Sequence, residues 1–203
     1  MSARRAAVLA VATILLLGSC GSPAPDEPAP TTSAPTTSPA PSPSATSAEP
    51  DAPVPFPADV AADEQPASAG AALTVTDVTT GEHDGYDRVV FRFDGTGTPG
   101  WMVRYVDVAT DDPADTVLDI AGDGTLQVTL LGIGLPADTG IPEWSGTNPI
   151  LTPDYPVLRE VAVRGQFEGQ ELAFVGVDTA GHPFRVFALT DPVRVVLDVR
   201  HDS

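Results

Sequence analysis

The sequence predicts an all-β domain built as a two-sheet β-sandwich of about eight strands. Three observations support this prediction. Apolar and polar residues alternate in many short segments, turn-forming residues separate these segments, and no long segment has helical periodicity. Evenly spaced short strands without intervening helices favour a sandwich or barrel over an α/β fold. The domain is expected to span residues 71–203, which is long enough to bury a substantial core.

The clearest strand covers residues 193–199, where apolar and charged side chains alternate as they do in a strand with one solvent-facing side. Residues 88–93 and 126–130 repeat this alternation. The other expected strands are 73–78, 101–108, 157–167, 171–177 and 184–189. Glu168-Gly169 between two apolar runs indicates a tight hairpin, because Gly accommodates a positive φ. One weak helix is expected over 113–118.

The interval 134–156 interrupts the strand pattern with an irregular, proline-rich segment. Loops of this length in compact domains are usually functional or without fixed structure. Trp144, Asn148 and Tyr155 could combine an apolar stacking surface with amide hydrogen bonds, which suits a glycan or peptide ligand. Alternatively, Trp144 and the prolines close one end of the sandwich core.

The start of the chain has the layout of an export signal over residues 1–19. Arg4 and Arg5 precede an apolar run that is too short to cross about 30 Å of hydrocarbon comfortably. The segment Leu17-Gly18-Ser19-Cys20 resembles the bacterial lipobox, and Cys20 is the only cysteine. This resemblance implies that Cys20 is lipidated and holds the protein at the extracytoplasmic face of the cell membrane. A plain secretory signal with an incidental cysteine is the alternative.

Residues 20–70 are rich in Pro, Ala, Ser and Thr and are expected to form a disordered tether after the lipidated cysteine. Such a segment cannot bury enough apolar surface to offset the entropy of ordering it. The formal net charge of the whole chain is −18, and the sequence contains no lysine. A field of this sign repels phosphate backbones, so nucleic acid is not an expected partner.

Two terminal motifs of the domain and one hairpin indicate a family. Residues 85–95 (GYDRVVFRFDG) and 99–106 (PGWMVRYV) form the first motif, residues 184–186 and 191–201 form the second, and residues 165–169 (GQFEG) form the hairpin. In these segments the chain resembles the actinobacterial AMIN-like domain over roughly residues 73–201. The resemblance implies a β-sandwich similar to the AMIN domain, which localises amidases and secretins at the envelope by binding peptidoglycan.

The resemblance therefore implies a non-catalytic module whose partner is an envelope component, with peptidoglycan as the first candidate. A module that docks an envelope protein through a strand edge or the long loop is the alternative. A cell-wall hydrolase is the third hypothesis. Among possible nucleophiles, Ser145 and Ser203 lie outside any nucleophile-elbow pattern, and Cys20 is expected to be lipidated.

Other catalytic and metal-binding chemistry finds little support. The three histidines have no spacing typical of a zinc site, and no cofactor is expected. Glu168 and Glu171 form the nearest carboxylate pair, but they flank a turn where water should keep both ionised. The acidic run over 111–123 could offer oxygen ligands to calcium, although it matches only part of an EF-hand loop.

Three arginines provide a second candidate binding surface. Arg88, Arg92 and Arg104 lie on strands that could be neighbours, where they would present forked donors to the carboxylates of peptide stems or to an anionic polymer. In so acidic a protein, the alternative is that these arginines pair with Asp and Glu of the same chain.

Overall fold

The computed structural model describes residues 54–57, 59–111 and 114–201. The predicted signal peptide, Cys20 and most of the predicted tether lie outside these residues. The described chain is nearly all β, with twelve strands and one single-turn helix. None of its helices is long and apolar enough to cross a membrane.

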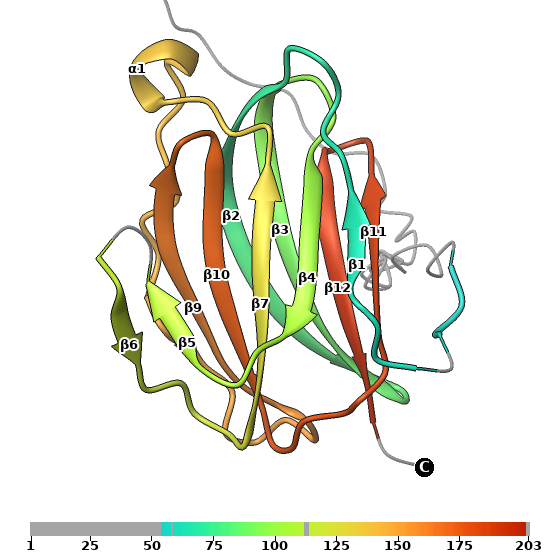
Figure 1. The fold of residues 1–203 in the computed structure, drawn as a ribbon. Coiled ribbons are helices and arrows are strands. Elements are labelled where there is room, and N and C mark those ends of the chain that lie inside the picture. Colours follow the sequence, from blue (N-terminus) through green and yellow to red (C-terminus); the bar gives the residue numbers. More distant parts are fainter. Residues whose placement is uncertain (1–53, 58, 112–113, 202–203) are drawn as a thin grey trace, which may run out of the picture. The chain divides into compact units, whose positions relative to one another are not determined.

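The strands form two main sheets that face each other, with β7 and β10 in front of β2 and β3 in Figure 1. Sheet A contains, in spatial order, β1 (Asp63–Gln65), β4 (Gly100–Tyr105), β7 (Gly124–Leu131), β10 (Gln170–Val177), β9 (Leu158–Phe167) and β8 (Ile150–Leu151). Sheet B contains β11 (Phe184–Leu189), β12 (Arg194–Arg200), β3 (Tyr86–Thr96) and β2 (Ala72–His83). A separate hairpin pairs β5 (Ala109–Asp111) with β6 (Thr116–Leu118).

The core lies between the two sheets because each long strand points alternate side chains inward. In β12 the inward residues Val195, Leu197 and Val199 are at most 1 % exposed. They pack in one cluster with the inward residues of the facing strand β7, which are Leu126, Val128 and Leu130. The predicted two-sheet β-sandwich is thereby confirmed.

The eight predicted strands correspond to the eight longest strands of the described chain. The four additional strands, β1, β5, β6 and β8, have only two or three residues each, too few to produce a visible alternation. Strand β1 lies within the range expected for the tether, and its three polar residues are held by backbone pairing with β4. The prediction of a helix over 113–118 was wrong, because residues 116–118 form β6. Thr and Val are β-branched residues that favour strands.

The long interval after Ile133 is partly regular. It begins with helix α1 (Pro136–Thr139), which has Pro at its first turn and the left-handed Gly140 (φ 67°) at its C-terminal end. It continues through an extended segment to β8, which pairs with β9. The interval therefore runs along the open side of the sandwich between the edge strand β2 and the β8–β9 edge.

The outer face of sheet B carries a buried ion pair. Arg88 and Asp198 lie opposite each other on β3 and β12, and they are 2 % and 0 % exposed. Arg88 Nε donates to Asp198 Oδ1 at 2.6 Å, and Arg88 Nη2 donates to Asp198 Oδ2 at 3.0 Å. Arg185 of β11 also donates to Asp198 Oδ2, from Nε at 2.8 Å. One carboxylate thus joins three strands.

The segment before β1 lies on this same outer face. Arg185 Nη1 donates to the carbonyl oxygen of Val54 at 2.9 Å. The guanidinium of Arg185 also stacks over the ring of Phe56, 4.2 Å from its centroid, a cation–π contact. The ring of Tyr86 lies 6.0 Å from the ring of Phe56. These contacts of residues 54–56, named here the N-terminal latch, fix the chain to sheet B before it reaches sheet A.

Candidate functional site

A cavity of about 290 Å³ opens where the long interval crosses the side of the sandwich. Its walls are Val75 of β2, residues 163–165 of β9, Glu171 of β10 and most of segment 143–148. Two of the predicted binding residues, Trp144 and Asn148, line this cavity. A concave site with one aromatic wall and a few polar groups has the character of a small-ligand site.

Backbone pairing holds the cavity wall formed by segment 143–148. The Trp144 N–H donates to the carbonyl of Val75 at 2.9 Å, beside the register shift in β2. Asn148 Nδ2 donates to the Val163 carbonyl at 2.6 Å, and Asn148 Oδ1 accepts from the Val163 N–H at 3.0 Å. The Asn148 side-chain amide thus pairs with β9 as the backbone of a neighbouring strand would. These hydrogen bonds position the cavity wall formed by segment 143–148.

Trp144 contributes both to the core and to the cavity. Its side chain is partly buried and packs against the core cluster, as the alternative interpretation of the sequence expected, but it also lines the opening. A Cβ placed on Gly146 would lie 2.5 Å from Trp144 Nε1, so the indole packs directly on the glycine backbone. Gly146 therefore fixes the orientation of the aromatic wall.

We expect Gly146→Ala to displace the Trp144 indole while leaving the sandwich folded, because the three atoms nearest to the new methyl group all belong to this side chain. The change should shift the tryptophan fluorescence maximum. Gly81→Ala, at a position in β2 without a positive φ where the added methyl group meets only the His83 ring, at 3.3 Å, serves as a control that leaves the indole in place. An unchanged emission spectrum for Gly146→Ala would contradict this account of the wall.

Glu171 lies at the inner end of the cavity and is 5 % exposed. Its side chain lies on the core-facing side of β10, the same side as those of the core residues Ala173 and Val175. The pKa of Glu171 is raised from 4.5 to about 7, chiefly by burial and further by the nearby Glu143 carboxylate, while a backbone hydrogen bond from Gly165 acts in the opposite direction. A carboxylate poised near neutral pH inside a cavity is typical of a functional site.

The sequence identified the wrong partner for this carboxylate. Glu168 sits in the tight turn with φ 49° and lines a different depression, whereas Glu143 shares the cavity with Glu171. The expectation that water surrounds Glu171 was also wrong. The alternation along β10 places Glu171 at a core-facing position. A charged residue at such a position is usually either paired or part of a functional site, so this pattern could have identified Glu171.

The remaining predicted binding residues lie elsewhere. Tyr155 is half-buried near Arg159, whose Nη1 donates to the Tyr155 carbonyl at 2.6 Å. Arg88 is buried in its pair with Asp198. Arg92 and Arg104 are exposed, but β3 and β4 belong to different sheets, so the expectation that their strands are neighbours was wrong. The connection over 97–99 carries the chain from one sheet to the other.

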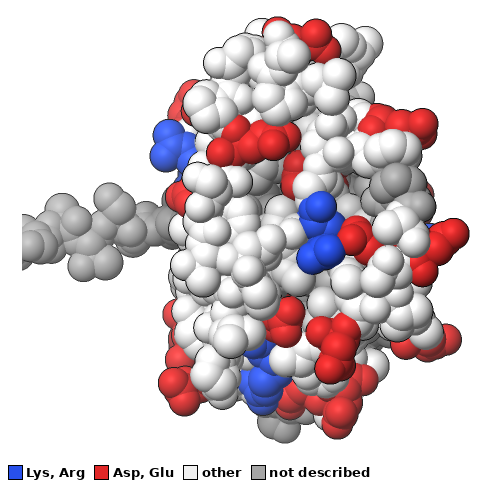
Figure 2. Space-filling view, turned by 90° about the vertical axis from the view of Figure 1, so that its left-hand side faces the viewer, with Lys and Arg blue, Asp and Glu red and all other residues white. Residues whose placement is uncertain are grey.

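Basic side chains form no continuous surface on the side of the molecule shown in Figure 2, where they appear as isolated groups among acidic ones. Arg164, which lines the cavity, illustrates the pattern. Its Nη2 lies 2.7 Å from Asp111 Oδ2, linking β9 to hairpin β5–β6. Among the three arginines predicted as a binding surface, Arg88 meets an acidic partner of the same chain, as the alternative interpretation expected of all three.

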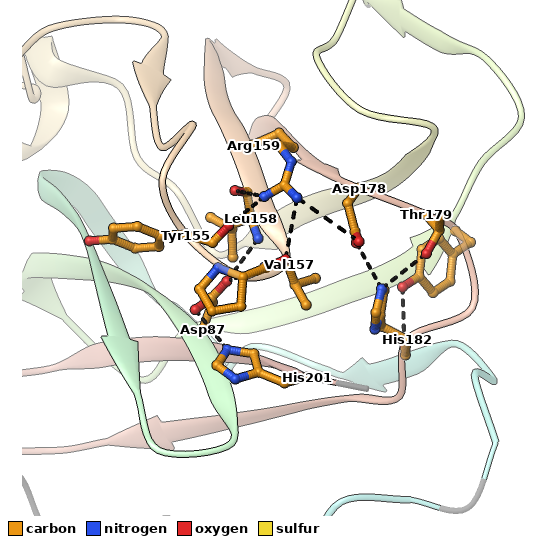
Figure 3. A network of polar contacts seen from close by, with 11 residues as sticks. Asp87, Tyr155, Val157, Leu158, Arg159, Asp178, Thr179, His182 and His201 are labelled. Carbon is orange, nitrogen blue, oxygen red and sulfur yellow. Dashed lines mark hydrogen bonds and ion pairs between the residues drawn. The ribbon is translucent and has the colours of Figure 1, made fainter. Parts of the chain in front are cut away.

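His182 and His201 belong to networks of polar contacts (Figure 3). His201 Nε2 lies 2.9 Å from Oδ1 of the buried Asp87, whose Oδ2 accepts the N–H groups of Val157 and Leu158 at 2.8 Å. Asp87 therefore fastens the start of β9 to β3 and to the end of the chain.

His182 has an arrangement that superficially resembles a catalytic triad. His182 Nε2 lies 2.8 Å from Asp178 Oδ1 and 3.1 Å from Thr179 Oγ1. A triad needs the carboxylate and the nucleophile on opposite ring nitrogens, whereas both partners here use Nε2, and His182 is only 3 % exposed. Within the described residues no group of three or more His, Cys, Asp and Glu side chains could hold a metal ion.

Comparison with known proteins gave one finding. The family model described as AMIN-like domain matches residues 73–201. Neither the curated proteins nor the solved structures gave a match.

Proposed function

Because the chain belongs to the AMIN-like domain family, we propose that it is a lipid-anchored, extracytoplasmic and non-catalytic module that binds a component of the cell envelope. Peptidoglycan is the first candidate ligand. The cavity beside Trp144 is the proposed binding site, because it combines an aromatic wall, polar groups and a carboxylate whose pKa lies near neutrality.

The anchoring part of the proposal rests on the sequence. A short apolar run preceded by two arginines ends in Leu17-Gly18-Ser19-Cys20, and Cys20 is the only cysteine. Acyl chains on Cys20 would hold the protein at the membrane, because each buried methylene contributes about 0.8 kcal/mol. The proline-rich residues between Cys20 and the latch would carry the domain away from the lipid surface.

The chemistry of the cavity suits a glycan or peptide better than a reaction. Trp144 offers an apolar face for stacking, while Ser145 and the two glutamates offer polar groups around it. Hydrolysis would require a nucleophile or an acid and base placed about a scissile bond. Glu143 is exposed, so its carboxylate lies at the mouth of the cavity. Glu171 is 5 % exposed, so its carboxylate lies at the inner end.

We expect the full chain, purified in detergent, to co-sediment with purified cell wall and not with insoluble cellulose. Trp144→Ala should reduce the bound fraction about tenfold, because loss of one stacking aromatic side chain costs about 1–2 kcal/mol. Phe167→Ala is the matched control, since Phe167 is an exposed aromatic residue (42 %) that lines a different depression. Absence of wild-type protein from the wall pellet would defeat peptidoglycan as the ligand.

A protein partner is the second candidate, and one observation favours it. Strand β11 forms an edge of sheet B, so one side of its backbone is available for pairing with another chain. Crosslinking in intact cells distinguishes the two proposals: a single dominant protein adduct through β11, with no retention by cell wall, would support the protein partner.

A further inference from the structure

We propose that the cavity binds a primary ammonium group, held between the carboxylates of Glu143 and Glu171 with its aliphatic stem against Trp144. This inference rests on the proposed function and names its ligand chemistry. In peptidoglycan the corresponding group is the side-chain amine of the diamino acid in a stem peptide. The anionic or neutral parts of the wall are then secondary contacts.

The shape and lining of the cavity support a small cationic group on an apolar stem. About 290 Å³ accommodates a lysine-like side chain but not a disaccharide with its peptide. Val75, Val163 and the Trp144 ring supply apolar contact on the walls. The inner end carries the Glu171 carboxylate, which would form an ion pair with an ammonium group that enters the cavity ahead of its aliphatic stem.

The charges around the cavity leave a place for a cation. Glu143 of segment 143–148 and Arg164 of β9 are the charged groups that line the cavity with Glu171, while β2 contributes only Val75. Arg164 lies 2.7 Å from Asp111, which offsets its positive charge. Two carboxylates therefore line one cavity, and Coulomb repulsion between them is relieved when an ammonium enters.

An anionic ligand fits the same cavity poorly. Its negative charge would meet both glutamates, and the Arg164 guanidinium already has Asp111 as a partner. An aromatic wall adds further preference for a cation, because the face of an indole attracts positive charge by about 0.5–2 kcal/mol. Each wall of the cavity thus selects for the same class of ligand.

Binding should strengthen with pH, because an ammonium needs the ionised form of Glu171. With a pKa of about 7, the ionised fraction of Glu171 rises from about one tenth at pH 6 to about nine tenths at pH 8. The association constant should therefore rise about tenfold over this range. Glu171→Gln should remove both the binding and its dependence on pH.

The Glu171→Gln variant should fold, which keeps the test sharp. The folded-state pKa of Glu171 is about 7 and its ordinary value is 4.5, so the folded state binds the proton more tightly. Stability from this group is present below about pH 4.5 and is lost as pH rises towards 7. Glutamine has no such loss, so the Tm of Glu171→Gln should exceed that of the wild type at pH 8 and approach it at pH 4.5.

The experiment titrates the full chain in detergent with Nα-acetyl-lysine and, separately, with Nα,Nε-diacetyl-lysine, and follows the indole N–H of Trp144, which lines the cavity, by NMR. We expect a shift with the first probe, no shift with the second, and at least a tenfold loss of affinity in Glu171→Gln. Glu168→Gln is the matched control, because Glu168 lies on the same hairpin outside the cavity. Equal binding of both probes, or full binding by Glu171→Gln, would overturn the ammonium proposal.

Cell wall with acetylated amines separates this proposal from the proposed function. If the protein pellets equally with native and acetylated wall and ignores the lysine probe, the ammonium proposal is overturned and wall binding stands. If the protein binds the lysine probe but does not pellet with native wall, the cavity is an ammonium site and peptidoglycan is not its ligand. Failure of both measurements overturns both proposals.

Discussion

Replacing Asp198 with alanine is expected to lower the free energy of unfolding by about 3–5 kcal/mol, because it removes the carboxylate from a buried ion pair. Asp198 is 0 % exposed and accepts hydrogen bonds from both Arg88 and Arg185. Without Asp198, the buried Arg88 guanidinium loses the charge that compensates its own. Urea unfolding followed by circular dichroism measures the effect.

Two further variants show that the effect comes from the charge pair. Asp94→Ala changes an exposed carboxylate on the same strand as Arg88 and should alter stability by less than about 0.5 kcal/mol. The double variant Arg88→Met with Asp198→Leu should be less destabilised than Asp198→Ala, since it removes both charges together. If the double variant unfolds more easily than the single one, the desolvated charge is not the cause.

Replacing Cys20 with alanine is expected to move nearly all of the protein from the membrane fraction to the soluble extracytoplasmic fraction or to block its export, because the proposed acyl attachment is lost. A single covalent site with two or more acyl chains determines membrane residence almost completely. Fractionation with immunoblotting measures the distribution, and metabolic labelling with palmitate measures the modification. The wild-type protein should be labelled and Cys20→Ala should not.

A second substitution separates anchoring from transport. Ser19→Ala keeps a small residue before Cys20, so the variant should remain labelled and membrane-bound. Absence of palmitate label from wild-type protein that still resides in the membrane fraction would mean that another part of the chain holds the protein at the membrane, and the lipid-anchor proposal would then be abandoned.

The fold could be predicted from the sequence because each long strand carries its own pattern. Residues 193–199 alternate so regularly that a shift of one residue in register would turn Val195, Leu197 and Val199 away from the core. Which strands become neighbours depends on contacts that no local pattern contains. The separation of β3 from β4 into different sheets is such a case, and it explains why Arg88 and Arg104 do not share a surface.

The site could be predicted only in part. The unusual composition of 134–156 indicates the segment that forms one wall of the cavity and contains Trp144, because loops rich in proline and aromatic residues stand out against strands. The inner end of the cavity comes from Glu171 on β10, and the proximity of Glu171 to Glu143 depends on how the loop returns to the sheet edge. The sequence predicts that the Asn148 amide contacts a ligand, but in the structure this amide is hydrogen-bonded to the backbone of Val163 in β9.

The N-terminal latch determines how tension on the chain enters the domain. In the proposed anchored state, a pull from the membrane reaches Val54 and Phe56 first, then the three register pairs of β1, and only then β2, which pairs with β3 along its whole length. The contacts nearest the anchor are the fewest, so residues 54–65 yield before the sandwich does. Their release lengthens the chain between the anchor and the domain by about 40 Å. The sandwich itself therefore stays folded while residues 54–65 extend under tension.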